Sequence, residues 1–564
     1  LIGRDASVLT TGPHDLDSLH YHLTQAAQIV ESHNIDRIHH TASSDGTAYY
    51  PYDAELLDAV GMLGPRPDIA VFGLNLLFGW LALLACWVIG ACWSRGAPAL
   101  AAGSAVLALP IVSRASSGPG LNDIPTMAFL LSAVAMVAVA GLPRGDKPRN
   151  RWLTELSLAG AALGLAAGTK LNALPVVVLL ALAVVVMASK SRWAAFAALA
   201  GPAVVTGGFW YVRDWITVGS PVPDLNLTVA GHGFHVVPYP EVQPFAYTVA
   251  HYLGDYSVIR HWFVPGLHAV WTGLWPLVGL LLVAGVVIAV VFDRSGLRRA
   301  LGIVTAAGFL AYLVTPTTAI GVAGAPVLFA TNTRYALPSI VVAIVLLASS
   351  PRLRRVAPIV TICFTVLTLV LLALSSLPQQ IDYGEGTAVT VAIVLVGFGA
   401  REIVRRRRTA VAVGVLAAVV AVGVVGWGAV LQRNYLRDRY SSHGFQDRLF
   451  ATVGAFQHVR IGVAGHGLQY PFYGRTFDNT VNYIGVSAPS HAFEGPSTCQ
   501  ALLGVLDRVH DDYVVLEPLP AAHTGRIAKW LSAIPGVQVV FRDYDGTVYR
   551  LPATIPADSC LYSS

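Results

Sequence analysis

The chain has 564 residues, of which 55% are hydrophobic and 12% are charged, and its mean hydropathy is +0.60. A soluble domain ordinarily carries about 25% charged residues, so this composition excludes a soluble globular enzyme. The net charge of +5 does not indicate a nucleic-acid-binding protein, because the basic residues fall in short loops between apolar runs. The sequence therefore predicts a polytopic α-helical membrane protein.

The first predicted segment, residues 1–68, is polar and begins with neither a methionine nor a signal peptide, so we expect a transmembrane helix to precede it. It carries Asp15 and Asp17 ahead of a helix-like run at 19–30. Asp is favoured at helix N-caps and first turns, which would explain one of the two aspartates. A carboxylate facing a hydroxyl acceptor can instead act as a general base, and we predict that role for at least one of them.

Histidines crowd the same segment and, with the aspartates, could bind a divalent metal such as Mg²⁺ or Mn²⁺. His20 and His22 do not share a helix face, so a helical metal clamp is not indicated. A metal site would use Asp15, Asp17 and His20, whereas Tyr21 and His22 are candidates for contacts with an acceptor. The six histidines of the segment are His14, His20, His22, His33, His39 and His40.

A series of apolar runs follows, long enough for a transmembrane bundle of about 12 helices across residues 69–431. Lys and Arg gather in alternate loops, which the positive-inside rule places on the cytoplasmic face. The opposite, extracytoplasmic face then carries residues 1–68, the outer loops and everything after residue 431. The outer loops are 114–123, 213–265 and 316–335, and the predicted spans are 69–93, 97–113, 124–141, 153–169, 172–188, 194–212, 267–292, 300–316, 336–350, 357–376, 386–400 and 409–431.

Polar residues recur where the outer loops meet the spans. Asn122 and Asp123 open the span at 124, where they could cap the helix or contact a donor phosphate, an acceptor or a metal. The loop at 213–265 is rich in Pro, Tyr, Trp and His, and could be either an interfacial loop with aromatic anchors or a mobile flap over a donor site. We favour the interfacial loop.

Three cations, Lys170, Arg213 and Arg334, lie at the same outer face as the aspartates. Lys170 could simply extend its ammonium toward the interface, and Arg213 could pair with Asp214 or a lipid. Three separate cations on the face that carries the aspartates favour an anionic, phosphate-bearing substrate.

Residues 432–564 are predicted to form a soluble extracytoplasmic α/β domain. The glycine-rich run at 462–467 resembles a nucleotide loop only faintly, because the G-x-G-x-x-G spacing is absent, so nucleotide binding is not favoured. The expected strands are 459–463, 513–516, 537–541 and 547–551, and the expected helices are 446–457, 498–510 and 521–534.

The five cysteines fall into two groups. Cys86, Cys92 and Cys363 lie in apolar spans, where they are expected to be packing residues. Cys499 and Cys560 lie in the C-terminal domain and are candidates for a disulfide if that domain is outside the cytoplasm.

Taken in order and on one face, short motifs across roughly residues 10–340 resemble the GT-C superfamily of polyprenyl-phosphate-dependent glycosyltransferases. The resemblance is greatest to the family 39 group, which includes protein O-mannosyltransferases and lipid A aminoarabinose transferases. The motifs are Asp17-Ser18-Leu19-His20-Tyr21-His22, Asn122-Asp123, Gly168-Thr169-Lys170, Arg213-Asp214-Trp215 with Gly219-Ser220-Pro221, and Arg334-Tyr335-Ala336-Leu337-Pro338.

The resemblance implies an inverting transfer of a sugar from a polyprenyl-phosphate donor to a glycan, lipid or protein acceptor outside the cell membrane. It implies that Asp17 is the base and that Lys170, Arg213 and Arg334 bind the donor phosphate. Many relatives have Glu directly after the Asp, whereas position 18 is Ser here, so the division of labour between Asp15 and Asp17 stays open.

Two other functions compete with this prediction: a transporter or flippase of lipid-linked sugars, and a non-catalytic envelope assembly protein. A transporter usually places polar or broken helices near the bilayer midplane. Here the charged residues gather at the outer edge, which favours the enzyme.

Overall fold

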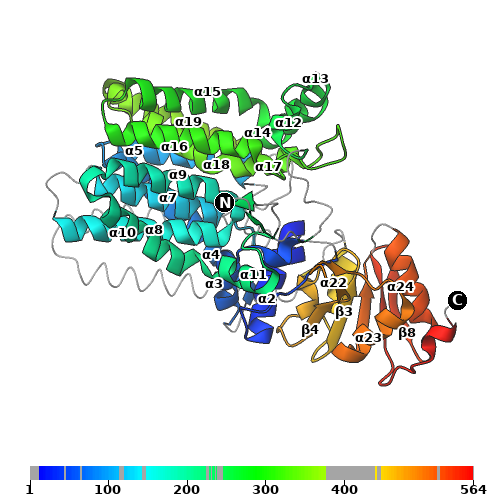
Figure 1. Ribbon diagram of the computed structural model, residues 1–564. Coiled ribbons are helices and arrows are strands. Elements are labelled where there is room, and N and C mark those ends of the chain that lie inside the picture. The colour runs from blue at the N-terminus through cyan, green and yellow to red at the C-terminus, as the bar shows by residue number, and fades with distance from the viewer. Residues whose placement is uncertain are drawn as a thin grey trace, which may run out of the picture.

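The computed structural model describes residues 12–43, 46–63, 67–113, 120–142, 148–223, 228–229, 232–234, 237, 246–376, 439–440, 446–517 and 521–562. The chain folds into a multi-span helical membrane body and a C-terminal mixed α/β domain (Figure 1). The first polar segment contacts both parts. We call the end of the body that the charge rule assigns to the extracytoplasmic face the outer end.

Every predicted span up to residue 376 coincides with a helix, and those at 386–400 and 409–431 lie outside the described residues. Six of the described helices are long and apolar enough to cross a membrane, or seven if the bent pair α10–α11 is one span. The count of twelve therefore stays a prediction. The helices of the body are α4 (Pro67–Ala91), α5 (Gly96–Leu107), α6 (Pro110–Ser113), α7 (Asp123–Ala140), α8 (Arg149–Thr169), η3 (Leu171–Ala173), α9 (Leu174–Met187), α10 (Arg192–Gly207), α11 (Phe209–Val218), α14 (Val264–Trp271), α15 (Trp275–Val287), η7 (Ile288–Phe292), α16 (Gly296–Val314), α17 (Phe329–Asn332), η8 (Thr333–Ala336), α18 (Leu337–Ala348) and α19 (Ala357–Ser376).

The outer loop at 213–265 is more helical than expected. Its first residues complete α11, and from residue 256 onward the chain is already in the helix that continues through the body to residue 292. Asp255 begins this helix, because its carboxylate accepts hydrogen bonds from the backbone N–H groups of Ser257 and Val258. A helix cap of this kind is a local sequence signal, but the aromatic composition of the loop led us to expect an interfacial loop instead of a helix.

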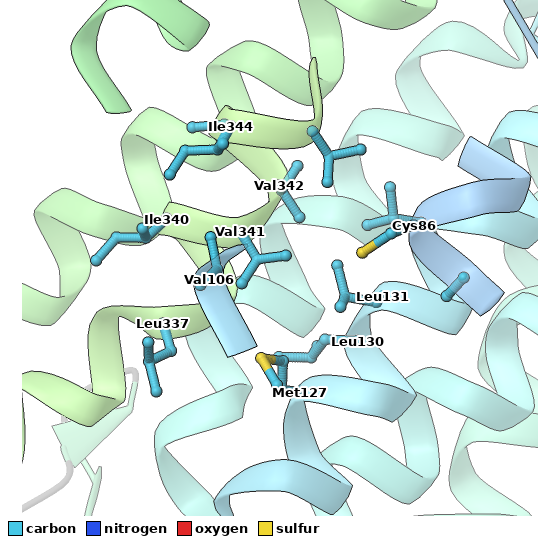
Figure 2. Packing of buried hydrophobic residues seen from close by; sticks show 14 of the residues in the cluster. Cys86, Val106, Met127, Leu130, Leu131, Leu337, Ile340, Val341, Val342 and Ile344 are labelled. Carbon is cyan, nitrogen blue, oxygen red and sulfur yellow. The ribbon is translucent and has the colours of Figure 1, made fainter. Parts of the chain in front are cut away.

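Helix α18 passes through the centre of the body and is buried along most of its length. Its residues Leu337, Ile340, Val341 and Ile344 pack beside Val106 of α5, and Met127, Leu130 and Leu131 of α7 belong to the same cluster (Figure 2). Close packing of this central helix fixes the position of the residues directly before it, which include Arg334.

Helix α8 carries glycines at every fourth position, Gly160, Gly164 and Gly168. A Cβ at Gly160 or Gly164 would overlap the backbone of α10, so the glycines allow the two helices to approach closely. At Gly168 the neighbour is the carboxylate of Asp53, which belongs to the first segment. The stripe therefore holds the outer end of α8, just before Lys170, against both α10 and the first segment.

At the opposite end of the body, Arg298 is fully buried, although it lies in a basic stretch that the charge rule assigns to the cytoplasmic face. Its guanidinium pairs with Asp293 and donates hydrogen bonds to the Leu346 carbonyl at 2.5 Å and to Ser349 Oγ at 3.0 Å. An arginine in this position donates a hydrogen bond to a carbonyl in the last turn of α18, and the negative end of that helix dipole stabilises its positive charge.

The C-terminal domain contains a five-stranded sheet in the order β4-β3-β7-β9-β8. Strands β4, β3 and β7 are parallel, and β9 runs antiparallel to both β7 and β8. The predicted strands and helices are all present, but β4 and the short strands β5 and β6 were not predicted. The elements are α22 (Asp447–Val453), β3 (Arg460–Ala464), η10 (Tyr470–Tyr473), β4 (Thr480–Tyr483), β5 (Val486–Ser487), β6 (Phe493–Glu494), α23 (Cys499–Val509), β7 (Tyr513–Leu516), α24 (Ala521–Ala533), β8 (Gln538–Asp543), β9 (Gly546–Arg550) and η11 (Ser559–Tyr562).

The loop formed by the glycine-rich run after β3 binds a side chain of the protein itself, the carboxylate of Glu517. The backbone N–H of Leu468 donates to the Glu517 carboxylate at 3.0 Å, and Gly465 has a φ of +115°, which favours glycine. Burial raises the pKa of Glu517 to about 7. The loop thus supports an internal carboxyl group.

Cys499 and Cys560 form a disulfide that joins the start of α23 to η11 and closes a loop over a sequence separation of 61. The disulfide is consistent with an extracytoplasmic domain. Loop-closure entropy predicts that replacing both cysteines by serine lowers the free energy of unfolding of the domain by about 4 kcal/mol.

Thermal unfolding of the full-length protein in detergent, combined with limited proteolysis of residues 446–562, would measure this loss. Cys363→Ser, which removes a free cysteine on α19, is the control and should leave both readouts unchanged. Equal stability of the double variant and the wild type would show that the disulfide contributes nothing to the fold.

Candidate active site

In the described part of the first segment, a short π-helix, η1 (Ser18–His22), continues into α2 (Leu23–Ser32). Asp15 Oδ1 accepts a hydrogen bond from the Ser18 backbone N–H at 2.9 Å, so Asp15 performs the capping role. Asp17 makes no side-chain cap and is instead directed at Arg334, with an Oδ2–Nη2 distance of 2.8 Å.

Arg334 also approaches a second carboxylate. Its Nη1 lies 3.5 Å from Oδ2 of Asp123, and the other oxygen of Asp123 accepts a hydrogen bond from Lys170 Nζ at 2.6 Å. The two carboxylates and two cations thus form one charge cluster at the outer end of the body. Four residues that the sequence singled out from four separate segments, Asp17, Asp123, Lys170 and Arg334, are brought together.

Each member of the charge cluster is held by the end of a helical element. Asp123 is in the first turn of α7, where the helix dipole favours a negative charge. Lys170 follows the last residue of α8, and Arg334 is on η8, the turn that leads into the buried helix α18. The side chains of Lys170 and Arg334 are only 15% and 8% exposed, so both cations depend on the carboxylates for pairing.

Aromatic rings line the same charges. The Tyr335 ring lies beneath both cations, with its centroid 5.0 Å from Lys170 Nζ and 5.6 Å from the Arg334 guanidinium. Tyr21 packs against His22 at 4.0 Å between ring centroids and edge-on against Tyr50 at 6.0 Å. Burial and the neighbouring Asp17 raise the pKa of Tyr21 well above its ordinary value, so its hydroxyl keeps its proton.

The two aspartates of the first segment differ in their electrostatic environment. Burial raises the pKa of Asp15. Burial also opposes ionisation of Asp17, but the Arg334 guanidinium overrides it and holds the pKa of Asp17 below its ordinary value. Asp17 is therefore the more completely ionised of the two.

A buried glutamate that the sequence analysis missed lies behind the charge cluster. Glu55 is in the first turn of α3 (Asp53–Met62), and its Oε1 pairs with His22 Nδ1 and accepts a hydrogen bond from Asn122 Nδ2 at 3.3 Å. Asn122 makes no side-chain helix cap; its amide also donates to the Thr169 carbonyl at 3.0 Å. The available signal was three acidic residues within six positions of an otherwise apolar helix, Asp53, Glu55 and Asp58.

Arg213 lies apart from this charge cluster. It pairs with its neighbour Asp214 at 2.8 Å and donates to the Ala48 carbonyl at 3.3 Å. Its guanidinium packs over the rings of Trp210 and Tyr52. The arrangement matches the ion pair that the sequence analysis left open as an alternative to phosphate binding.

No group of three or more His, Cys, Asp or Glu side chains among the described residues is arranged to hold a metal ion. Asp15 is engaged with Ser18 and Asp17 with Arg334, while the His20 ring lies beside Gly467 of the C-terminal domain. The three residues considered for a metal site therefore point to different partners.

Much of the 213–265 loop, including residues 238–245, lies outside the described residues.

The C-terminal domain docks on the first segment. Gln469 Nε2 donates to the Thr41 carbonyl at 2.6 Å, and His14 Nε2 lies 2.7 Å from a buried oxygen of Asp447. A third contact stacks the ring of His40 on that of Phe493, with 4.3 Å between centroids. Figure 1 shows the first segment, with α2 and α3, lying between the helical body and this domain.

Comparison with solved structures identifies the fold. The chain superposes on ArnT from Cupriavidus metallidurans bound to undecaprenyl phosphate with a TM-score of 0.52 and 16% identity, over 97% of this chain and 95% of that chain. The apo state of that protein gives a TM-score of 0.48 at 17% identity, with the same coverage of both chains. The archaeal oligosaccharyltransferase AglB from Archaeoglobus fulgidus, in complex with an inhibitory peptide and a dolichol-phosphate, gives 0.41 at 12% identity, over 92% of this chain and 68% of that chain.

No family model and no curated protein sequence matches the chain. At 16% identity the likeness to ArnT shows that the two chains share a fold and does not identify a family, substrate or reaction. The function has to be argued from the residues of the charge cluster.

The ion pair between Asp17 and Arg334 makes stability depend on pH. Because the folded state depresses the pKa of Asp17, the pair stabilises the protein above about pH 4 and loses this contribution as the pH falls further. Arg334→Gln should therefore lower the free energy of unfolding at neutral pH by about 1.5–3 kcal/mol and flatten its decline between about pH 5 and 3.

Unfolding of the detergent-solubilised protein as a function of pH would measure both effects. Arg151→Gln is the matched control, because Arg151 forms an ion pair with Glu155 but is 70% exposed. Its removal should change the stability by less than about 1 kcal/mol. Identical pH profiles for Arg334→Gln and the wild type would contradict the assignment.

Proposed function

We propose that this protein is an inverting membrane glycosyltransferase that transfers a sugar from a polyprenyl-phosphate donor to a cell-envelope acceptor at the outer face. The observation that carries the proposal is the charge cluster, which sets an ionised aspartate, Asp17, beside two buried cations, Lys170 and Arg334. The GT-C fold supports it, because ArnT, a protein of that fold, was solved with undecaprenyl phosphate bound.

In this reaction Asp17 accepts the proton of the acceptor hydroxyl, whose oxygen attacks the anomeric carbon of the sugar. The bond between that carbon and the phosphate oxygen breaks, and the electron pair leaves with the polyprenyl phosphate. The configuration at the anomeric carbon is inverted, because the base and the leaving group act on opposite faces. No general acid is required if cations stabilise the charge that develops on the phosphate.

Both cations have hydrogen-bonding capacity left for a phosphate. Among the described residues, Nε of Arg334 is buried without a hydrogen-bond partner. An ammonium group has three N–H donors, of which the contact between Lys170 and Asp123 uses one. Arg and Lys together supply a planar fork and a compact point charge, which suit a phosphate with several oxygens.

The bond between Arg334 and Asp17 couples the donor to the base. A phosphate that draws the guanidinium toward itself weakens the hold on Asp17, which then becomes a stronger base at the moment when the electrophile is present. This exchange would limit futile chemistry in the absence of donor. The polyprenyl tail of the donor would lie among the spans, and the sugar identity and the acceptor class, whether glycan, lipid or protein, are left open.

Asp17→Asn should reduce glycosyl transfer by a factor of about 10²–10⁴, because it removes the base and preserves the size of the side chain. Binding of polyprenyl phosphate should persist, since the cations remain. The measurement is transfer from a panel of polyprenyl-phosphate sugars to membrane acceptors by the purified protein, with binding of undecaprenyl phosphate determined in parallel.

Asp15→Asn is the matched control, because Asn caps a helix about as well as Asp does, and transfer should stay within about threefold of the wild type. Full activity of Asp17→Asn with loss in Asp15→Asn would move the base to Asp15. A wild type that transfers no sugar from any donor, but moves sugar lipids across vesicles, would overturn the enzyme in favour of a transporter.

Lys170→Gln should weaken binding of undecaprenyl phosphate about 10- to 100-fold, which corresponds to the loss of one charge-assisted hydrogen bond. Arg213→Gln should change this affinity far less, because its guanidinium is engaged with Asp214 and Ala48 outside the charge cluster. Titration of both variants with the lipid in detergent would separate them. An equal loss in both would return Arg213 to the donor site.

A further inference from the structure

Glu55 is the most completely buried acidic side chain near the charge cluster, with an exposure of 0%, and no step of the proposed reaction uses it. It lies on α3, whose other acidic residues, Asp53 and Asp58, are driven toward the neutral form. Burial raises the pKa of Asp53 to about 7 and that of Asp58 well above its ordinary value. Glu55, on the same helix, contacts the ring of His22.

The contacts of Glu55 lead to three of the four members of the charge cluster. His22 ends η1, the turn that directly follows Asp17. Asn122 immediately precedes Asp123, and the same Asn122 amide that donates to Glu55 also donates to the carbonyl of Thr169, the residue before Lys170. One carboxylate therefore ties together η1, the start of α7 and the end of α8.

Stability alone does not account for this carboxylate. A buried polar contact such as that between Glu55 and His22 is commonly no more stabilising than a well-packed apolar pair of the same shape, because both polar groups must leave water. In addition, Oε2 of Glu55 and Oδ1 of Asn122 are buried without a hydrogen-bond partner among the described residues. The contacts of Glu55 and Asn122 instead fix the positions of three helix ends relative to one another.

We propose that Glu55 is a positioning residue, which acts through His22 and Asn122 to hold Asp17 at a set distance from Asp123 and Lys170. The inference rests on the proposed function. A base must reach the acceptor hydroxyl while the cations hold the phosphate, and a misplacement of about 1 Å can cost about 100-fold in rate. Glu55 supplies this constraint from behind the charge cluster, without touching the substrates.

The test compares Glu55→Gln with Glu31→Gln. Glu31 is the control, because it is a glutamate on α2 of the same first segment, but its exposed side chain accepts a hydrogen bond from the Val481 backbone N–H of the C-terminal sheet, away from the charge cluster. Glu55→Gln should lower kcat about 100-fold, while the affinity for undecaprenyl phosphate stays within about threefold of the wild type. Glu31→Gln should leave both quantities near their wild-type values.

Two further readouts separate positioning from a general loss of structure. In a double-mutant cycle, His22→Gln added to Glu55→Gln should reduce kcat little further, since both substitutions break the same connection. Hydrogen exchange should accelerate in residues 18–22, 120–126 and 166–172 of Glu55→Gln and stay unchanged there in Glu31→Gln. If Glu55→Gln does not fold, Asn122→Ala, which breaks one branch, takes its place.

A kcat within about threefold of the wild type in a folded Glu55 variant would overturn the inference, as would a fully additive cycle with His22→Gln. These outcomes leave the proposed function intact, because the wild type is assayed in the same experiment. If the wild type itself transfers no sugar, the proposed function fails, and the exchange measurement alone decides whether Glu55 fixes the three helix ends.

Discussion

Arg334 forms the interaction on which the outer end of the protein depends. A guanidinium that is 8% exposed cannot stay unpaired at low cost, and it finds its partners in Asp17, on the first segment, and Asp123, at the start of α7. Those two carboxylates are separated by more than a hundred residues of chain, so pairing the charge requires distant segments to meet. The position of Arg334 itself is set by η8 and the buried helix α18. Electrostatic pairing at one end and apolar packing along the helix thus specify the same geometry.

The sequence predicted the helices and strands better than the contacts between them. Hydropathy located the spans up to residue 376 because each is a local apolar run, and β4 was missed because Thr480–Tyr483 is a short, mixed stretch. Asp17 was recognised by its place ahead of a helix-like run, and Lys170 and Arg334 as cations at the outer face, but the contacts between them were not predicted. That Arg213 would pair with Asp214, while Lys170 would reach Asp123, depends on contacts across the fold that no spacing encodes.

Glu55 was missed by the sequence analysis for the same reason, because its importance depends on contacts across the fold. An acidic triplet in a polar segment ordinarily indicates a solvated helix face, and only the fold buries this one against α7 and α8. The glycines of α8 belong to this explanation, because they let the end of that helix approach the first segment. The C-terminal domain closes the other side of the segment, with the loop around Glu517 placed next to Thr41 and His20.

The contacts of the first segment with that domain can form only after the domain has been synthesised. Three of its contacts with the first segment, Gln469 with Thr41, Asp447 with His14, and His491 with Tyr49, join residues 428 to 442 positions apart. At about 5–20 residues per second of synthesis, the first segment waits roughly 20–90 s before its partner surface has been made. During that interval the helical body can already be inserted, while the segment that carries Asp17 still lacks its contacts with the C-terminal domain. A domain that is translated later therefore completes the surroundings of that segment.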